Sequence, residues 1–124
     1  MDDYRELRVW QQGIELAVTC YGITKPFPRE EMFGMTSQIR RAASSVPANI
    51  AEGWGRQSTG DYIKFLRIAQ GSLKELETHL ILCNRIELIS TEQLTELETQ
   101  TTAIGKMLAA LIRSLQQKKS GNRQ

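Results

Sequence analysis

The sequence predicts an all-α protein, an antiparallel up-and-down bundle of four helices. Apolar residues recur at steps of three and four in four separate segments, which is the period of a helix with one buried face. Short connections join the segments, as in antiparallel bundles. No stretch alternates apolar and polar residues in the manner of a half-buried strand. These observations predict helices near residues 3–24, 35–55, 59–86 and 91–117.

The first predicted helix, residues 3–24, begins with a capping pattern and ends at a proline-rich loop. Asp3 precedes Glu6 by three positions, and acidic side chains are favourable at a helix start. The segment Lys25-Pro26-Phe27-Pro28 ends the helix, because a residue before proline disfavours helical dihedral angles. The stripe expected to face the core comprises Leu7, Trp10, Ile14, Ala17 or Val18, and Tyr21.

The second predicted helix, residues 35–55, has a proline in its interior. Pro47 removes one helical hydrogen bond and its ring clashes with the preceding turn, at a cost of about 3 kcal/mol. Either one helix bends at Pro47 or two shorter helices meet there, and we predict one kinked helix. Its core side carries Ile39, Ala42, Ala43, Val46, Ile50 and Trp54.

The third and fourth predicted helices, residues 59–86 and 91–117, have the clearest boundaries. Ser58 precedes Asp61 by three positions, and Ser90 precedes Gln93 in the same way, which are N-terminal capping patterns. The third stripe is Tyr62, Phe65, Leu66, Ala69, Leu73, Leu76, Leu80 and Cys83. The fourth is Leu94, Leu97, Thr101, Ile104, Leu108, Leu111 and Leu115.

A chain of 124 residues is the size of one domain. We predict a bundle domain over residues 1–117 and a flexible basic tail over residues 118–124. The start of the chain is acidic rather than basic, unlike a signal peptide, and no apolar run approaches the ~18 residues of a membrane span. We therefore expect a cytoplasmic protein without membrane contact, in which Cys20 and Cys83 are buried, reduced thiols. A disulfide would require the first and third helices to bring them together.

The net charge of +2 indicates no partner, but the charges are segregated along the chain. Residues 32–74 carry six basic and two acidic groups, whereas residues 75–98 carry one and six. A basic stretch can form a patch that neutralises phosphates, although it can also be an ordinary solvated helix face. The candidate nucleic-acid-binding residues are Arg40, Arg41, Arg56, Lys64, Arg67 and Lys74.

Polar residues on flanks of the second and third helices predict a structural hydrogen-bond network. Polar side chains beside a core are costly unless they are paired, and Arg41 with Glu75 is one expected pair. The network could join helices within a chain or between subunits. Its candidate members are Arg41, Ser45, Asn49, Glu52, Ser72 and Glu75.

The sequence contains no pattern typical of a catalytic or metal site. His79 is the only histidine, whereas di-metal sites in bundles use a Glu-x-x-His pair on each of two helices. There is no Cys-x-x-Cys, glycine-rich phosphate loop or nucleophile elbow. We predict a protein that is not an enzyme and needs no cofactor or metal.

The run Ser44-Ser45-Val46-Pro47-Ala48-Asn49-Ile50-Ala51-Glu52-Gly53 resembles the signature of a bacterial four-helix-bundle family. This is the family of 23S rRNA intervening-sequence proteins, sometimes classed with ribosomal proteins. The similarity continues through Val9-Trp10, Phe33-Gly34 and Phe65-Leu66-Arg67-Ile68-Ala69, and covers roughly residues 4–115. It is therefore a resemblance of the whole fold and not of one motif.

The resemblance implies a bundle that assembles as a homopentamer. The accessory protein of diversity-generating retroelements is similar, and there a basic pentamer binds nucleic acid and a reverse transcriptase. We therefore expect a non-enzymatic oligomer that contacts RNA or DNA through basic surface residues. The alternative is a protein-protein scaffold or accessory subunit, for example of a reverse transcriptase or with a ribosomal component, that does not bind nucleic acid itself.

Overall fold

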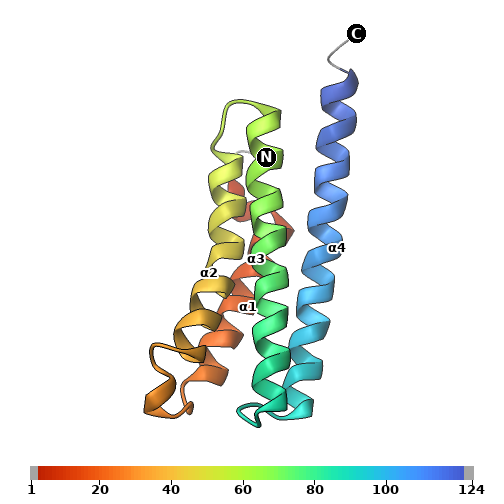
Figure 1. Cartoon of the computed structure of the whole chain (residues 1–124). Coiled ribbons are helices and arrows are strands. Elements are labelled where there is room, and N and C mark those ends of the chain that lie inside the picture. Colours follow the sequence, from red (N-terminus) through yellow and green to blue (C-terminus); the bar gives the residue numbers. More distant parts are fainter. Residues whose placement is uncertain (1–2, 122–124) are drawn as a thin grey trace.

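The computed structural model describes residues 3–121, and over that range it contains four α-helices, two 3-10 helices and no strand. The α-helices are α1 (Arg8–Thr24), α2 (Met35–Trp54), α3 (Thr59–Arg85) and α4 (Thr91–Gly121); the 3-10 helices are η1 (Tyr4–Glu6) and η2 (Arg29–Glu31). Successive α-helices run in opposite directions, and α4 extends beyond the α2–α3 connection (Figure 1). The predicted four-helix bundle is confirmed.

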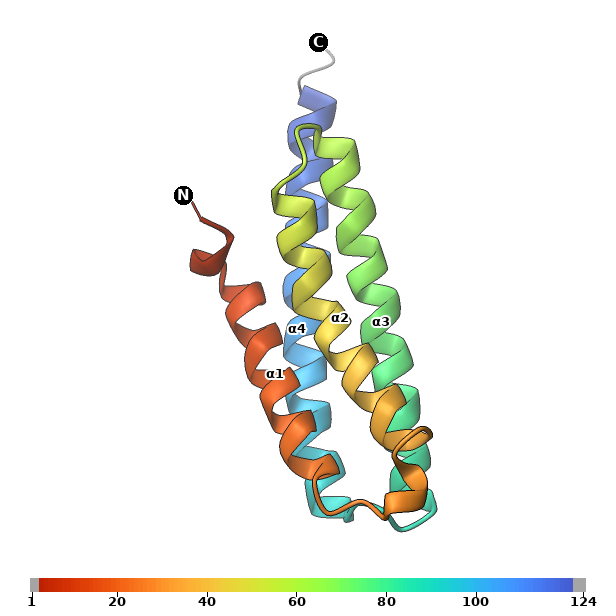
Figure 2. The same cartoon turned by 90° about the vertical axis from the view of Figure 1, so that its left-hand side faces the viewer.

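The order of the helices around the bundle follows the chain. Helix α1 packs against α2, α2 against α3, and α3 against α4, while α4 also contacts α1. Figure 2 shows α1 and α3 on opposite sides of the bundle. Leu16, Ile50, Leu76 and Leu108 represent the four helices in the core, and each is fully buried. No helix within residues 3–121 has the length and apolar character needed to cross a membrane.

Helix α1 starts later than the capping pattern predicts. Asp3 does cap a helix, since its carboxylate accepts the backbone N–H of Arg5 at 2.9 Å, but the capped element is η1. Leu7 then adopts an extended conformation (ψ 124°) and interrupts the helix before Arg8. The predicted continuous helix over residues 3–24 is therefore wrong at its start, because a pattern of side-chain caps does not reveal a backbone break one turn later.

The core side of α1 also differs from the prediction. The buried residues of this helix are Val9, Gly13, Leu16, Cys20 and Thr24. Of the predicted stripe, Leu7, Trp10 and Ala17 are partly buried, whereas Ile14, Val18 and Tyr21 are exposed. Helix α1 carries two apolar sides, and helical spacing alone does not decide which one the other helices cover.

Helix α2 is one continuous helix that includes Pro47, and the alternative of two shorter helices meeting there is wrong. Pro47 is buried and lies against Gly13 of α1. A Cβ atom added to Gly13 would be only 3.3 Å from the Cβ of Pro47. The absence of a side chain at Gly13 therefore lets α1 approach the proline ring closely, and contacts made by that ring offset part of the cost of a proline inside a helix.

The predicted caps of α3 and α4 are present. The Ser58 hydroxyl accepts the Asp61 backbone N–H at 3.1 Å. Ser90 and Gln93 form a reciprocal capping box, with bonds of 2.9 and 3.1 Å. Helix α4 continues to Gly121, past the predicted end at residue 117, since no proline stops it and lysines near a C-terminus favour the helix dipole. The rest of the predicted tail, residues 122–124, lies outside the described range.

Both cysteines are free and buried, as expected for inert thiols. Burial raises the pKa of the Cys20 thiol to about 12 and that of Cys83 to about 11, with the negative charge of Glu31 contributing at Cys83. We expect neither thiol of the native protein to react with Ellman's reagent at pH 8, and both to react in denaturant, since the thiolate is the nucleophile. Rapid labelling of a native thiol would contradict this burial.

Candidate nucleic-acid interface

The three candidate arginines of α2 and its C-terminal end interact with side chains of their own chain. The Arg40 guanidinium donates to Thr24 Oγ1 at 2.9 Å and lies 4.7 Å from the centre of the Tyr21 ring. The Arg56 guanidinium donates to Glu52 at 2.8 Å and lies over the Phe65 ring. Arg40 and Arg56 therefore each have partners within the chain.

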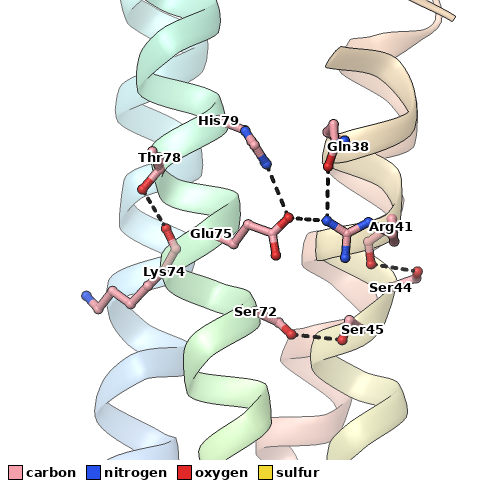
Figure 3. A network of polar contacts seen from close by, with 9 residues as sticks. All are labelled: Gln38, Arg41, Ser44, Ser45, Ser72, Lys74, Glu75, Thr78 and His79. Carbon is pink, nitrogen blue, oxygen red and sulfur yellow. Dashed lines mark hydrogen bonds and ion pairs between the residues drawn. The ribbon is translucent and has the colours of Figure 1, made fainter. Parts of the chain in front are cut away.

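Arg41 belongs to a polar network between α2 and α3 (Figure 3). Its guanidinium bonds to Glu75 and donates to Gln38 at 3.0 Å, so the expected pair of Arg41 and Glu75 forms within one chain. The same Glu75 oxygen lies 3.2 Å from His79 Nε2. Partial burial by itself would raise the pKa of Glu75, but its hydrogen bonds with His79 and Arg41 and the charge of Arg41 hold that pKa below its usual range.

A second set of hydrogen bonds continues along the same helix pair. The hydroxyls of Ser45 and Ser72 are 2.8 Å apart, and the Asn49 amide donates to the carbonyl and hydroxyl oxygens of Ser45. Glu52, the remaining candidate, does not join them, because it pairs with Arg56 one turn further on. The network therefore links α2 to α3 within the chain. Arg41 and Glu75 are substantially exposed, so the ion pair itself contributes little to stability.

The three basic candidates of α3 lie on its exposed side, away from this network. Lys74 points away from Glu75 and towards solvent in Figure 3, and its ammonium is 3.3 Å from Glu77. Arg67 makes one long bond of 3.5 Å, to Gln70. Lys64 takes part in no ion pair among the described residues. Lys64, Arg67 and Lys74 therefore have fewer or weaker partners within the chain than Arg40, Arg41 and Arg56.

A groove between α3 and α4, here called the basic groove, lies beside this exposed side. It has a volume of about 690 Å³. Its floor consists of small and apolar residues such as Leu73 and Gly105, and its cations are Arg67 and Lys74 from α3 and Lys106 from α4. One acidic residue, Glu77, is also present. A smaller hollow of about 370 Å³ continues from Arg67 towards Lys119 at the end of α4.

Lys106 and Lys119 were not among the candidate nucleic-acid-binding residues, although Lys119 lies in the predicted basic tail. Residues 99–124 carry five basic and no acidic groups, which helix-dipole matching explains as well as a ligand does. Only the packing of α3 against α4 places Lys106 opposite Lys74 and Lys119 beside Arg67. Gly71, which costs helix stability, lines the groove, and no atom of a neighbouring helix lies within 4 Å of where its Cβ would be.

The chemistry of the basic groove favours charge over sequence recognition. Its lining combines cations with small side chains and includes no aromatic ring on which a base could stack. Lysine and arginine bind phosphate groups regardless of base identity. Within residues 3–121 no cluster of three or more histidine, cysteine or acidic side chains is arranged to hold a metal ion.

Comparisons with known proteins give two findings. The family model described as 23S rRNA-intervening sequence protein matches residues 5–110. A crystal structure from Bacteroides thetaiotaomicron, of a protein with unknown function from the S23 ribosomal protein family, is similar with a TM-score of 0.76 and 34% sequence identity. That match covers 84% of this chain and 97% of the other. A comparison with curated proteins gives no match.

Proposed function

Since the chain belongs to the 23S rRNA-intervening sequence protein family, we propose that it is a non-catalytic, oligomeric bundle that contacts RNA through the basic groove. The observation that carries the proposal is the position of Arg67, Lys74 and Lys106 around one groove of about 690 Å³. Cations from two helices around a floor of small residues suit a phosphate backbone, whose neutralisation releases counterions.

Assembly and location are further parts of this proposal. We propose five copies, the number that the family resemblance implies, so that the basic groove is repeated around a ring. Repetition raises the effective concentration of weak phosphate contacts. We also propose a cytoplasmic location, which suits two free, buried thiols.

The test is a salt titration of binding to a structured RNA, measured by fluorescence anisotropy. Removing the groove cations Arg67, Lys74 and Lys106 together (each to alanine) is expected to weaken binding at low salt at least tenfold. The slope of log affinity against log salt should become shallower by about 2 to 3, because each phosphate contact contributes about 0.7 to 0.9. An unchanged affinity and slope would exclude these side chains as the RNA contact.

Two controls separate the groove from general electrostatics. The matched variant replaces Arg8, Lys25 and Arg29 with alanine; these residues are exposed, lie outside the groove lining, and give the same change in net charge. Its RNA affinity should fall by much less. The second control ends the chain after Gln117, since a basic end can bind RNA by itself. Loss of binding in this truncation alone would place the contact at the C-terminus.

A protein-protein scaffold is the second candidate, and one observation favours it. Phe33, between η2 and α2, is 89% exposed, and the neighbouring Met32 is 49% exposed. Exposed apolar side chains of this size mark protein contacts when they lie together. Wild-type protein that does not bind RNA even at low salt would support a scaffold or accessory subunit, for which a polymerase or ribosomal component is the candidate partner.

A further inference from the structure

One side of α1, here called the α1 outer face, carries the exposed side chains of Ile14, Val18 and Tyr21, and Trp10, which packs against the core, lies at its end. Val18 is 63% exposed, Tyr21 44% and Ile14 36%, while Trp10 is partly buried. The upper part of this face adjoins a shallow hollow of about 320 Å³ that α1 shares with α2. A row of large apolar side chains that remains exposed in a folded chain marks a surface that another helix covers.

A second long surface, the α4 outer face, consists mainly of small side chains, with one acidic and one basic residue. A hollow of about 530 Å³ on α4 is lined by Thr95, Glu98, Thr99, Thr102, Ala103 and Lys106. The Thr95 and Thr99 hydroxyls donate to backbone carbonyls one turn earlier, at 2.9 and 3.1 Å. Covering this face with apolar side chains therefore leaves neither of these hydroxyls unsatisfied. Small residues also let a helix with bulky side chains approach closely.

The two faces match in length and in height along the bundle. Trp10 to Tyr21 and Thr95 to Lys106 each span about 17 Å of helix. Within one chain the Gln100 amide reaches Thr19 at 3.4 Å, which sets the relative height of α1 and α4. In copies that stand side by side in the same direction, Val18 would meet the middle of the α4 outer face. Glu15 would lie about half a turn from Lys106, its opposite charge.

We propose that the α1 outer face of one copy docks on the α4 outer face of the next copy. This contact is head-to-tail, because it joins two different surfaces, and such contacts build rings or filaments rather than closed pairs. The inference rests on the proposed oligomeric function and extends it, since Thr102 and Lys106 belong both to the α4 outer face and to the basic groove. Helix α1 of one copy would then border the groove of its neighbour.

The first experiment measures the mass of the full chain by light scattering, at micromolar concentration and without RNA. The wild type should show a multiple of 14.1 kDa. The variants Val18→Glu and Thr99→Arg should each have the mass of the monomer, and circular dichroism should show that they retain their helices. If Val18→Glu unfolds, Tyr21→Lys takes its place. Leu82→Glu is the control, an exposed apolar position on α3 that should keep the wild-type mass. A monomeric wild type, or folded variants with unchanged mass, would overturn the proposal.

The second experiment mixes Val18→Glu with Thr99→Arg. Each variant retains the face that the other has lost, so one intact contact forms and cannot be extended. The expected mixture contains a dimer of twice the monomer mass and nothing larger. If α1 of one copy instead paired with α1 of another, Thr99→Arg alone would remain associated, and mixing would produce no new species. That result would refute the head-to-tail contact. Because no RNA is present, these results are independent of whether the basic groove binds RNA.

Discussion

Replacing Leu76 with alanine is expected to reduce the free energy of unfolding by about 2–5 kcal/mol, the largest effect of any single change considered. Leu76 is fully buried on α3, in the middle of the core. Truncation removes apolar contacts and leaves a cavity, since close-packed neighbours relax only in part. Urea denaturation followed by circular dichroism measures the loss, at one fixed protein concentration because association adds to apparent stability.

Leu82→Ala is the matched control for this prediction. Leu82 lies on the same helix but is 43% exposed, so its truncation is expected to change stability by no more than about 0.5 kcal/mol. Equal losses for both variants would mean that α3 is rotated from the orientation described. A loss near zero for Leu76→Ala would place that side chain outside the core.

Replacing Gly53 with alanine is expected to destabilise the protein by about 1–3 kcal/mol, even though alanine favours helices. A Cβ atom at this position would lie 2.9 Å from Tyr62 Cδ1, 3.0 Å from the Phe65 Cβ and 3.1 Å from the Tyr62 carbonyl oxygen. Two of these atoms belong to backbone or to the root of a side chain, so the end of α2 must separate from the start of α3.

Gly71→Ala is the same substitution in an open environment and should have the opposite sign. No neighbouring atom lies within 4 Å of its would-be Cβ, so the gain in helix propensity of about 1 kcal/mol is not opposed. Thermal or urea denaturation of the two variants measures the contrast. A Gly53→Ala protein as stable as Gly71→Ala would show that the two helices are not in close contact at this point.

The residues that carry the family resemblance have structural roles in α2. Pro47 packs against Gly13 of α1, and Ile50 is fully buried. Ser45 hydrogen-bonds to Ser72 of α3, and Gly53 lies close to Tyr62 and Phe65 of α3. Asn49 donates to Ser45 within α2. These contacts account for most of the motif by the packing of α2 between α1 and α3.

The sequence by itself determined the fold class, the number of helices and most of their boundaries. These features depend on local signals: the capping pairs at Ser58 and Ser90, the prolines before η2, and the apolar period of α3 and α4. Hydrogen bonds of caps and helices form between residues close in the chain, so a short segment of sequence is enough to predict them. The polar pairing of Arg41 with Glu75 was also predictable, because both lie on flanks of adjacent helices.

Tertiary structure alone decided which side of α1 is buried and which cations remain available. Arg40 stands in the same basic stretch as Lys64 and Arg67, yet its guanidinium donates to Thr24 of α1. Lys106 joins the basic groove only because α4 packs beside α3. Helical periodicity fixes the angle of a side chain about its own axis. Which neighbour a side chain contacts depends on how all four helices pack around one core, and no single segment of the sequence determines that packing.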